Sequence, residues 1–183
     1  MLKTDSPPSV REVNENDYEN IVDYFLKADK DFLHRMGVDI NLLPKRDDWL
    51  NLLLYNHNKI IENKTIFYVI WLLGKTAVGH SNINKIIFGK EAYMHLHLWQ
   101  SDKRQKGIGS EFMKMSIPYY FNNFKLKKLF CEPYALNPAP NKILEKLGFE
   151  FIKQHETIPG WINFHQPVNR WCMDADKFKS LYT

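Results

Sequence analysis

The sequence predicts one domain of mixed α/β (α+β) class, with a central, mostly antiparallel mixed sheet flanked by helices. Three β-rich runs between residues 66 and 99 follow one another with short polar connections. Helical patterns precede these runs and also follow them. The length of 183 residues and the 44% hydrophobic content allow one substantial core. We therefore expect residues 1–8 to be flexible and residues 9–183 to form a single domain.

The first part of the chain predicts a strand followed by two helices. Residues 10–13 alternate like a short strand, and either Asn14 or Asn16 can cap the helix that follows. That helix takes in DYENIVDYFLKAD, whose apolar residues recur at helical spacing. The loop HRMGVDINLLP comes next. A second helix is expected over about 47–58, because its tryptophan and leucines fall on one face.

The middle of the chain predicts an antiparallel meander. Its runs IFYVIWL, TAVGHSNI and AYMHLHLW are rich in β-branched and aromatic residues. The longest apolar run, over residues 66–73, is too short to span a bilayer, and the N-terminus does not look like a signal peptide. We therefore expect a cytoplasmic protein without a membrane partner.

The last part of the chain alternates helices with strands. A helical pattern runs from Ile108 to about Phe124, and the strand KLFCEPY follows it. In NPAPNKILEKLGF, prolines at the first turn and Gly148 after the last turn bracket a short helix. The segments FEFIKQ and VNRWCMD are expected to close the chain as strands, joined by the loop IPGWINFHQP.

Charge and cysteine content limit the function. The 25 basic and 21 acidic residues give a net charge of +4, without a block of like charge. This distribution suits a small anionic ligand better than a nucleic acid, for which a basic stripe is expected. Cys131 and Cys172 lack CxxC spacing and lie in apolar, strand-like segments. We expect both to be free thiols, with a single disulfide as the alternative.

The stretch SDKRQKGIGSEFM, residues 101–113, combines cations with glycines where a predicted strand gives way to a predicted helix. Glycine lets the main chain approach a ligand closely, and the first N–H groups of a helix attract anions. The P-loop motif fails because Ser-Glu-Phe follows Gly109, and the dinucleotide motif fails because Phe112 replaces its third glycine. What remains is Arg104-x-x-Gly107-x-Gly109, with a plain tight turn as the alternative.

This pattern, followed by an asparagine, a short helix and Gly-Phe over residues 137–149, resembles the GNAT superfamily of N-acetyltransferases. The resemblance covers residues 9–174, and NPAPNKILEKLGFEFI is similar to the branch that acetylates ribosomal-protein N-termini. It implies two splayed strands in the sheet, acetyl-coenzyme A as co-substrate and no metal. It also implies direct attack of a primary amine on the thioester in a ternary complex. The alternative is a catalytically weak acyl-coenzyme A-binding or regulatory module of the same fold.

The resemblance also implies contacts to the coenzyme. The main chain of His97, Leu98 and Trp99 is expected to face the pantetheine and the thioester. Asn137 is expected to bind the pantetheine arm, and it can cap its helix as well. The residues expected to bind the coenzyme are Leu98, Trp99, Arg104, Gln105, Lys106, Gly107, Ile108, Gly109, Ser110, Asn137 and Asn141.

The reaction requires a base for the attacking amine. His95 and His97 share one face of their predicted strand, and an imidazole changes charge near neutral pH. Both are therefore base candidates, although a pair of structural histidines is the alternative. Glu132, on the other splayed strand, is a rival base. A backbone N–H near His97 is expected to stabilise the oxyanion.

The acid that protonates the leaving thiolate is unassigned by the sequence. The resemblance places a tyrosine or a serine at two positions that here hold Leu144 and Pro140. Tyr134 is a substitute candidate, and protonation by solvent is the alternative.

The resemblance implies that two variable segments, 31–39 and 158–167, flank the acceptor groove, with ordinary packing as the alternative role of their side chains. They contribute aromatic and histidine side chains, namely Phe32, His34, Trp161, Phe164 and His165. No acidic cluster there indicates a polyamine or an aminoglycoside. We expect a primary amine as acceptor, either a small molecule or a peptide N-terminus, and a monomer or homodimer.

Overall fold

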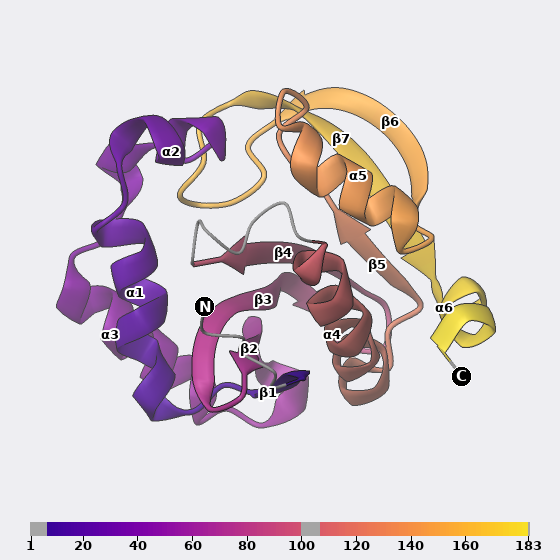
Figure 1. Ribbon diagram of the computed structural model, residues 1–183, viewed down its shortest axis with the longest axis horizontal. Coiled ribbons are helices and arrows are strands. Elements are labelled where there is room, and N and C mark those ends of the chain that lie inside the picture. The colour runs from indigo at the N-terminus through magenta and orange to yellow at the C-terminus, as the bar shows by residue number, and fades with distance from the viewer. Residues whose placement is uncertain (1–6, 100–106, 183) are drawn as a thin grey trace, which may run out of the picture.

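The computed structural model describes residues 7–99 and 107–182, and a seven-stranded sheet runs through them (Figure 1). The strands are β1 Pro8–Glu12, β2 Ile66–Leu73, β3 Thr76–Ile87, β4 Glu91–Leu98, β5 Lys128–Cys131, β6 Glu150–Thr157 and β7 Gln166–Asp174. Their order across the sheet is β1-β2-β3-β4-β5-β7-β6. Neighbouring strands are antiparallel except β4 and β5, which pair in parallel. The predicted mixed, mostly antiparallel sheet is confirmed.

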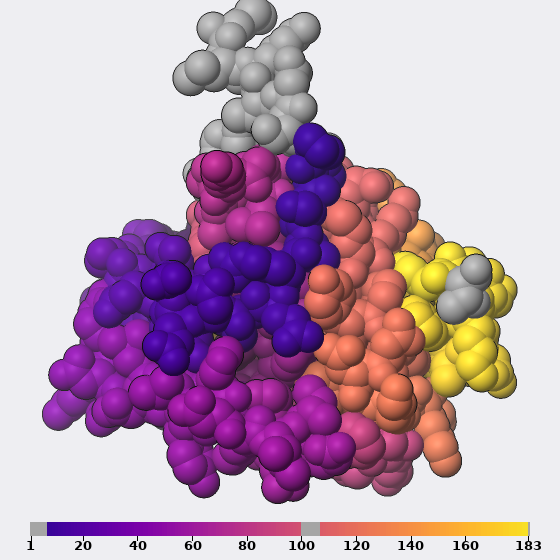
Figure 2. Space-filling model, turned by 90° about the horizontal axis from the view of Figure 1, so that it is seen from below, coloured from indigo at the N-terminus to yellow at the C-terminus, as the bar shows by residue number. Residues whose placement is uncertain are grey.

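Helices cover both faces of this sheet. They are α1 Tyr18–Leu26, α2 Lys30–Arg35, α3 Arg46–His57, α4 Ile108–Phe124, α5 Pro138–Lys146 and α6 Ala175–Tyr182, with 3-10 turns at Glu15–Asp17, Ile40–Leu42 and Ile61–Asn63. The N-terminal helices pack on one face, and α4 and α5 pack on the other (Figure 1). Figure 2 shows the N-terminal helices, in indigo to purple, on the opposite side of the molecule from α6, in yellow.

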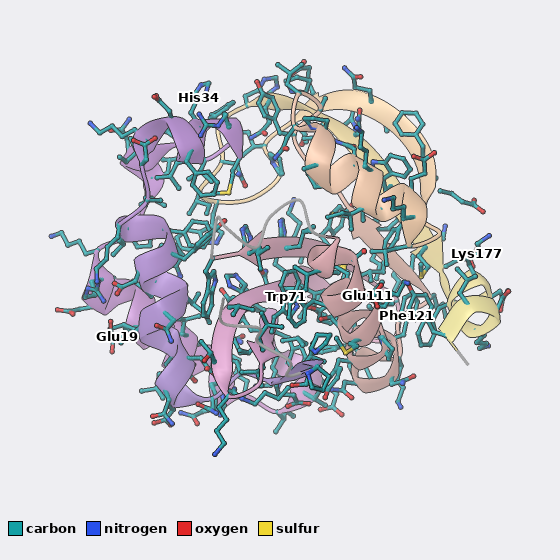
Figure 3. The ribbon with its side chains drawn as sticks, viewed as in Figure 1. Glu19, His34, Trp71, Glu111, Phe121 and Lys177 are labelled. Atoms are coloured by element: carbon teal, nitrogen blue, oxygen red, sulfur yellow. The ribbon has the colours of Figure 1, made fainter. Side chains whose placement is uncertain are left out.

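Successive side chains of β2 point to opposite faces of the sheet and so contribute to two core layers. Val69 and Trp71 point into the layer under α4, whereas Tyr68 and Ile70 point into the layer under α1 and α3. Trp71, at the centre of Figure 3, stacks on Phe112 of α4 with 5.1 Å between ring centroids. Burying a large apolar side chain stabilises a fold by about 1.5–3 kcal/mol, so both faces of the sheet contribute to stability.

Two helices differ from the sequence prediction. Helix α2 begins where no helix was expected, because the Oδ1 of Asp29 accepts the N–H groups of Asp31 and Phe32 at 3.0 and 3.1 Å. Helix α6 follows β7, where the chain was expected to close as a strand. The Oδ1 of Asp174 accepts the N–H of Lys177 at 2.8 Å and so satisfies one of its first amides.

Several smaller expectations are also decided. Asn14 is the residue that caps the first helical turn, since its side chain accepts a main-chain N–H at 3.0 Å. Strand β1 begins at Pro8, which pairs with Leu73, one residue before the expected start of the domain. Cys131 and Cys172 are both free, as expected. Within the described parts of the chain, none of the helices has the length and apolar character needed to cross a membrane.

Candidate active site

Strands β4 and β5 separate at the centre of the sheet. Their parallel pairing runs from Glu91 opposite Lys128 to Met94 opposite Cys131 and ends there, although β4 continues to Leu98. Beyond this point a cleft of about 900 Å³ opens between the two strands and extends to the N-terminal helices. The splayed strands expected from the sequence are confirmed by the end of this pairing.

The pairing of β4 with β3 decides which main-chain groups face the cleft. The N–H of Trp99 donates to the carbonyl of Val78 at 2.9 Å. Because an antiparallel strand alternates the direction of its main-chain groups, His97 also points to β3, where it pairs with His80. The main chain of Leu96 and Leu98 therefore points to the side of β5. This corrects the expectation for His97 and Trp99 and adds Leu96, which side-chain periodicity alone cannot identify.

The N-terminus of α4 forms one wall of the cleft. Gly107 precedes the helix with φ +74°, a conformation that favours glycine, and a Cβ there would meet nothing within 4 Å. Ser110 closes the first turn, since its N–H and Oγ donate to the carbonyl of Gly107 at 3.1 and 2.7 Å. The amides of Ile108 and Gly109 come before that turn closes, so helix geometry gives them no internal partner. The cations Arg104 and Lys106 and the neighbouring Gln105 lie outside the described residues.

Helix α5 forms the opposite wall. Asn137 occupies its N-cap position, but its side chain makes no capping hydrogen bond and lines the cleft instead. Lys142 and Lys146, one helical turn apart, line the same cleft. Sequence reasoning did not name these lysines. Their spacing of four in the helix after the asparagine is the signal that could have found them.

Asn141 holds α5 in place and does not line the cleft. Its Oδ1 accepts the indole N–H of Trp171 at 2.8 Å and the amide of Asn169 at 3.0 Å. Its Nδ2 donates to the carbonyl of Asn137 at 2.8 Å. Its polar atoms are thus committed to β7 and to the start of α5. In the structure Asn141 positions α5, and its expected contact to the coenzyme stays a prediction.

Three histidines lie together on the face of the sheet under the N-terminal helices. The rings of His80 and His97 are 4.8 Å apart, and the Nδ1 of His80 accepts the indole N–H of Trp99 at 2.8 Å. Burial, with a smaller contribution from His95, lowers the pKa of His80 to about 3. Burial, followed by the charge of Lys85, lowers the pKa of His95 to about 4. Both imidazoles are therefore neutral near pH 7.

Two buried polar side-chain atoms on this face lack a hydrogen-bond partner among the described residues. The Nε2 of His95 and the Oδ1 of Asn84 are buried, and neither has a hydrogen-bond partner within residues 7–99 and 107–182. Both residues line the cleft. Since buried polar groups are normally satisfied, these atoms indicate where a polar ligand binds.

Glu132 lines the cleft from the end of β5, but its carboxylate is already paired. Its Oε1 lies 2.6 Å from the Nε of Arg170 and 3.3 Å from the Nε2 of His155. Only 3% of its side chain is exposed. A base in this ion pair must give up its stabilising partner to accept a proton.

The two positions that the resemblance assigns to an acid supply no donor. Leu144 is fully buried in the core under α4, and Pro140 lines the cleft without a hydrogen to donate. Tyr134 also lines the cleft, and its ring packs edge-to-face against Phe164 at 5.9 Å.

The two variable segments join into a roof over the acceptor side. The carbonyl of Gly37 accepts amide N–H groups from Gln166 and Asn163, both at 2.8 Å. The N–H of Asp39 donates to the carbonyl of Ile162 at 2.8 Å. In Figure 1 the loop between β6 and β7 reaches α2 in this way. These contacts fix α2 and the loop between β6 and β7 to each other along one side of the cleft.

The expected groove residues divide into two sets. Phe32 and Trp161 line the cleft. His34, labelled in Figure 3, instead stacks on Phe164 at 5.1 Å and ties α2 to the loop. His165 is exposed and lies 3.5 Å from Glu156 on the outside of the roof.

Comparison with known proteins decides the family. A family model described as the acetyltransferase (GNAT) domain matches residues 9–150. The chain belongs to the GNAT acetyltransferase family. Its enzymes transfer an acetyl group from acetyl-coenzyme A to an amine, so the predicted class and co-substrate are confirmed. A search of curated proteins found no match for this GNAT chain.

Solved structures share the fold of this GNAT protein. A ribosomal protein L7/L12 α-N-acetyltransferase with coenzyme A has a TM-score of 0.75 and 13% identity, covering 96% of this chain and 98% of that one. A Vibrio cholerae spermidine N-acetyltransferase with coenzyme A and spermine has a TM-score of 0.74 and 16% identity, covering 94% and 98%. An aminoglycoside acetyltransferase with coenzyme A has a TM-score of 0.73 and 13% identity, covering 97% and 100%. At these identities the neighbours establish the fold and leave the acceptor open.

Proposed function

We propose that this protein transfers the acetyl group of acetyl-coenzyme A to a primary amine by direct attack in a ternary complex. The observation that carries the proposal is the cleft that opens where the pairing of β4 and β5 ends at Met94 and Cys131. Main-chain amides at the start of α4 and two lysines of α5 line one part of the cleft, and neutral histidines line another part. One cavity thus provides both an anion-binding end and an acceptor end.

The described residues fit the coenzyme on chemical grounds. The free amides of Ile108 and Gly109 at the start of α4 suit the pyrophosphate. Lys142 and Lys146 on the opposite wall add positive charge for the phosphates. The side chain of Asn137 makes no capping hydrogen bond and is therefore available to bind the pantetheine amides. When bound, the coenzyme supplies the activated acetyl thioester.

We assign the base to His95. Its Nε2 is buried, neutral near pH 7 and without a partner among the described residues, and it lines the acceptor side of the cleft. The N–H of Leu96, which points to the side of β5, is the donor for the oxyanion. His97 shares the same face and is the second candidate. Glu132 is less suited because Arg170 already holds its carboxylate.

The proposed reaction conserves atoms and charge. The amine nitrogen bonds to the acetyl carbon as the carbon–sulfur bond breaks, and the proton of the amine passes to the Nε2 of His95. The thiolate takes up a proton either from Tyr134 or from solvent. Replacing Tyr134 with Phe separates these two routes, because the solvent route leaves the rate unchanged.

The first prediction concerns activity and its base. Incubation with acetyl-coenzyme A and a panel of primary amines is expected to release free thiol above the hydrolysis background. His95→Gln is expected to lower kcat by about 10²–10³-fold, because general base catalysis typically contributes that much. The dissociation constant of acetyl-coenzyme A, measured by calorimetry, is expected to stay the same.

His97→Gln is the matched control on the same strand. A larger loss of kcat in His97→Gln than in His95→Gln moves the base to His97. Tight coenzyme binding without thiol release from any amine supports the binding-module alternative and contradicts the enzyme.

A further inference from the structure

The acceptor side of the cleft has no free carboxylate within the described residues. Glu132 is the acidic side chain that lines the cleft there, and Arg170 and His155 occupy its Oε1 at 2.6 and 3.3 Å. A second ammonium group on the acceptor, as a polyamine carries, therefore finds no counter-charge. Burying an unpaired charge is costly, so the pocket selects against polycations.

A cation stands at the edge of the same pocket. Arg35, in the last turn of α2, lines the cleft, and no acidic residue in the described parts of the chain pairs with it. Its guanidinium presents parallel N–H groups that match the two oxygens of a carboxylate. Its exposure keeps it accessible to a ligand that enters from solvent.

Contacts between side chains connect this cation to the floor of the pocket. Met36, next to Arg35, accepts the hydroxyl of Tyr24 at 3.2 Å through its sulfur. The ring of Tyr24 lies 5.4 Å from the ring of His97. Met36 and Tyr24 thus link the end of α2 to the histidine floor, and Arg35 and the histidines line the same cleft.

Other side chains that line the cleft also favour a particular kind of acceptor. Both unpartnered atoms are buried: the Oδ1 of Asn84 accepts hydrogen bonds, and the Nε2 of His95 accepts them in the tautomer protonated at Nδ1, which suits the N–H groups of an amine. The walls carry aromatic rings, including Trp49 and Trp161, which meet edge-to-face at 5.7 Å. Such walls favour an apolar or aromatic body.

We propose that the acceptor is a small amine of amino-acid type, with a carboxylate bound by Arg35 and an apolar or aromatic side chain against the rings. Its amine N–H groups bind His95 and Asn84. This inference rests on the proposed acetyl transfer and names the class of acceptor.

The second prediction tests this class with matched pairs. Phenylalanine, tryptophan and leucine are compared with their amides, and spermidine is included, with thiol release as the readout. The ratio of kcat/KM for acid over amide is expected to fall at least about tenfold in Arg35→Gln relative to the unmodified protein. Comparing ratios between proteins cancels the different pKa values of the amines. Arg35→Lys is expected to retain part of the preference.

Lys30→Gln is the control, because Lys30 is an exposed cation on α2 that does not line the cleft. It is expected to leave the ratio unchanged. If spermidine or the amides react better and Arg35→Gln changes nothing, the acceptor class is wrong while acetyl transfer stands. If no amine in a broad panel releases thiol although the coenzyme binds, the proposed function fails, and the acceptor class fails with it.

Discussion

Two histidines with lowered pKa values make the fold sensitive to acid. His80 and His95 have pKa values of about 3 and about 4 in the folded protein, whereas an unfolded histidine titrates near 6.5. Between pH 6.5 and these lower values, the unfolded chain binds more protons than the folded one. The free energy of unfolding therefore falls as the pH drops through this window. At pH 5 each histidine lowers it by about 2 kcal/mol.

The third prediction follows from this pH dependence. The melting temperature is expected to fall between pH 7.5 and pH 5, and His95→Gln is expected to make that fall shallower because it removes one titrating group. His165→Gln, at an exposed site, is the control and is expected to follow the unmodified protein. If the melting temperatures of His95→Gln and the unmodified protein fall equally with pH, the lowered pKa of His95 is contradicted.

At the scale of elements, the start of α4 depends on two glycines for different reasons. Gly107 needs its positive φ, so any side chain there adds about 1 kcal/mol of strain. Gly109 lies in the first turn of the helix, and a Cβ there would lie 3.5 Å from the Cδ1 of Ile143, an ordinary contact. A substitution at Gly109 therefore reports on the ligand without disturbing the backbone.

The fourth prediction uses this difference. Gly109→Glu is expected to raise the dissociation constant of acetyl-coenzyme A at least about tenfold, because a carboxylate enters the anion site at the helix N-terminus. Gly109→Ala is the matched control and is expected to keep the melting temperature and most of the affinity. Calorimetry measures both variants. If the dissociation constant is unchanged in Gly109→Glu, the proposed binding of the pyrophosphate at the N-terminus of α4 is contradicted.

The elements found from sequence are those whose signals are local. Helix α5 has prolines at its first turn and Gly148 after its last, and the meander has its short polar turns. Helix α2 was missed because its six residues include only one buried side chain, Leu33, too few for a periodic pattern. Its cap, Asp29, was the available local signal.

At the scale of the whole molecule, two distant segments, 37–39 and 162–166, meet beside the cleft. Gln166 is 1% exposed, and its Nε2 binds the carbonyls of Gly37 and Phe164 at 2.8 and 3.0 Å. A side chain on Gly37 would lie 2.0 Å from the Oε1 of Gln166, so a glycine is required there. The shape of the acceptor pocket therefore depends on residues more than a hundred positions apart.

The fifth prediction tests this roof. Gln166→Ala is expected to lower the free energy of unfolding by about 1–3 kcal/mol, because a buried carbonyl loses one of its donors. It is also expected to raise KM for the amine several-fold and to leave the coenzyme affinity unchanged. Gln154→Ala, at an exposed position on β6, is the control for both measurements. An equal loss of coenzyme affinity places Gln166 in a general structural role.

The sequence indicated the parts of the site that depend on local motifs and did not indicate the parts that depend on contacts between distant residues. The proposed coenzyme side rests on short motifs around Gly107 and Asn137, so a linear pattern in the sequence indicated it. The acceptor side depends on strand pairing, which stacks His80 against His97, and on the ion pair between Glu132 and Arg170. These partners lie 17 and 38 positions apart, and no local spacing indicates that they meet.

The early end of the β4–β5 pairing has a consequence for mechanics. The sheet consists of a four-stranded part and a three-stranded part joined by only four residue pairs along one short seam. A ligand in the cleft that bonds to both strands takes the place of the absent ladder. We therefore expect a co-substrate that bonds to both strands to stabilise the centre of the protein when it binds.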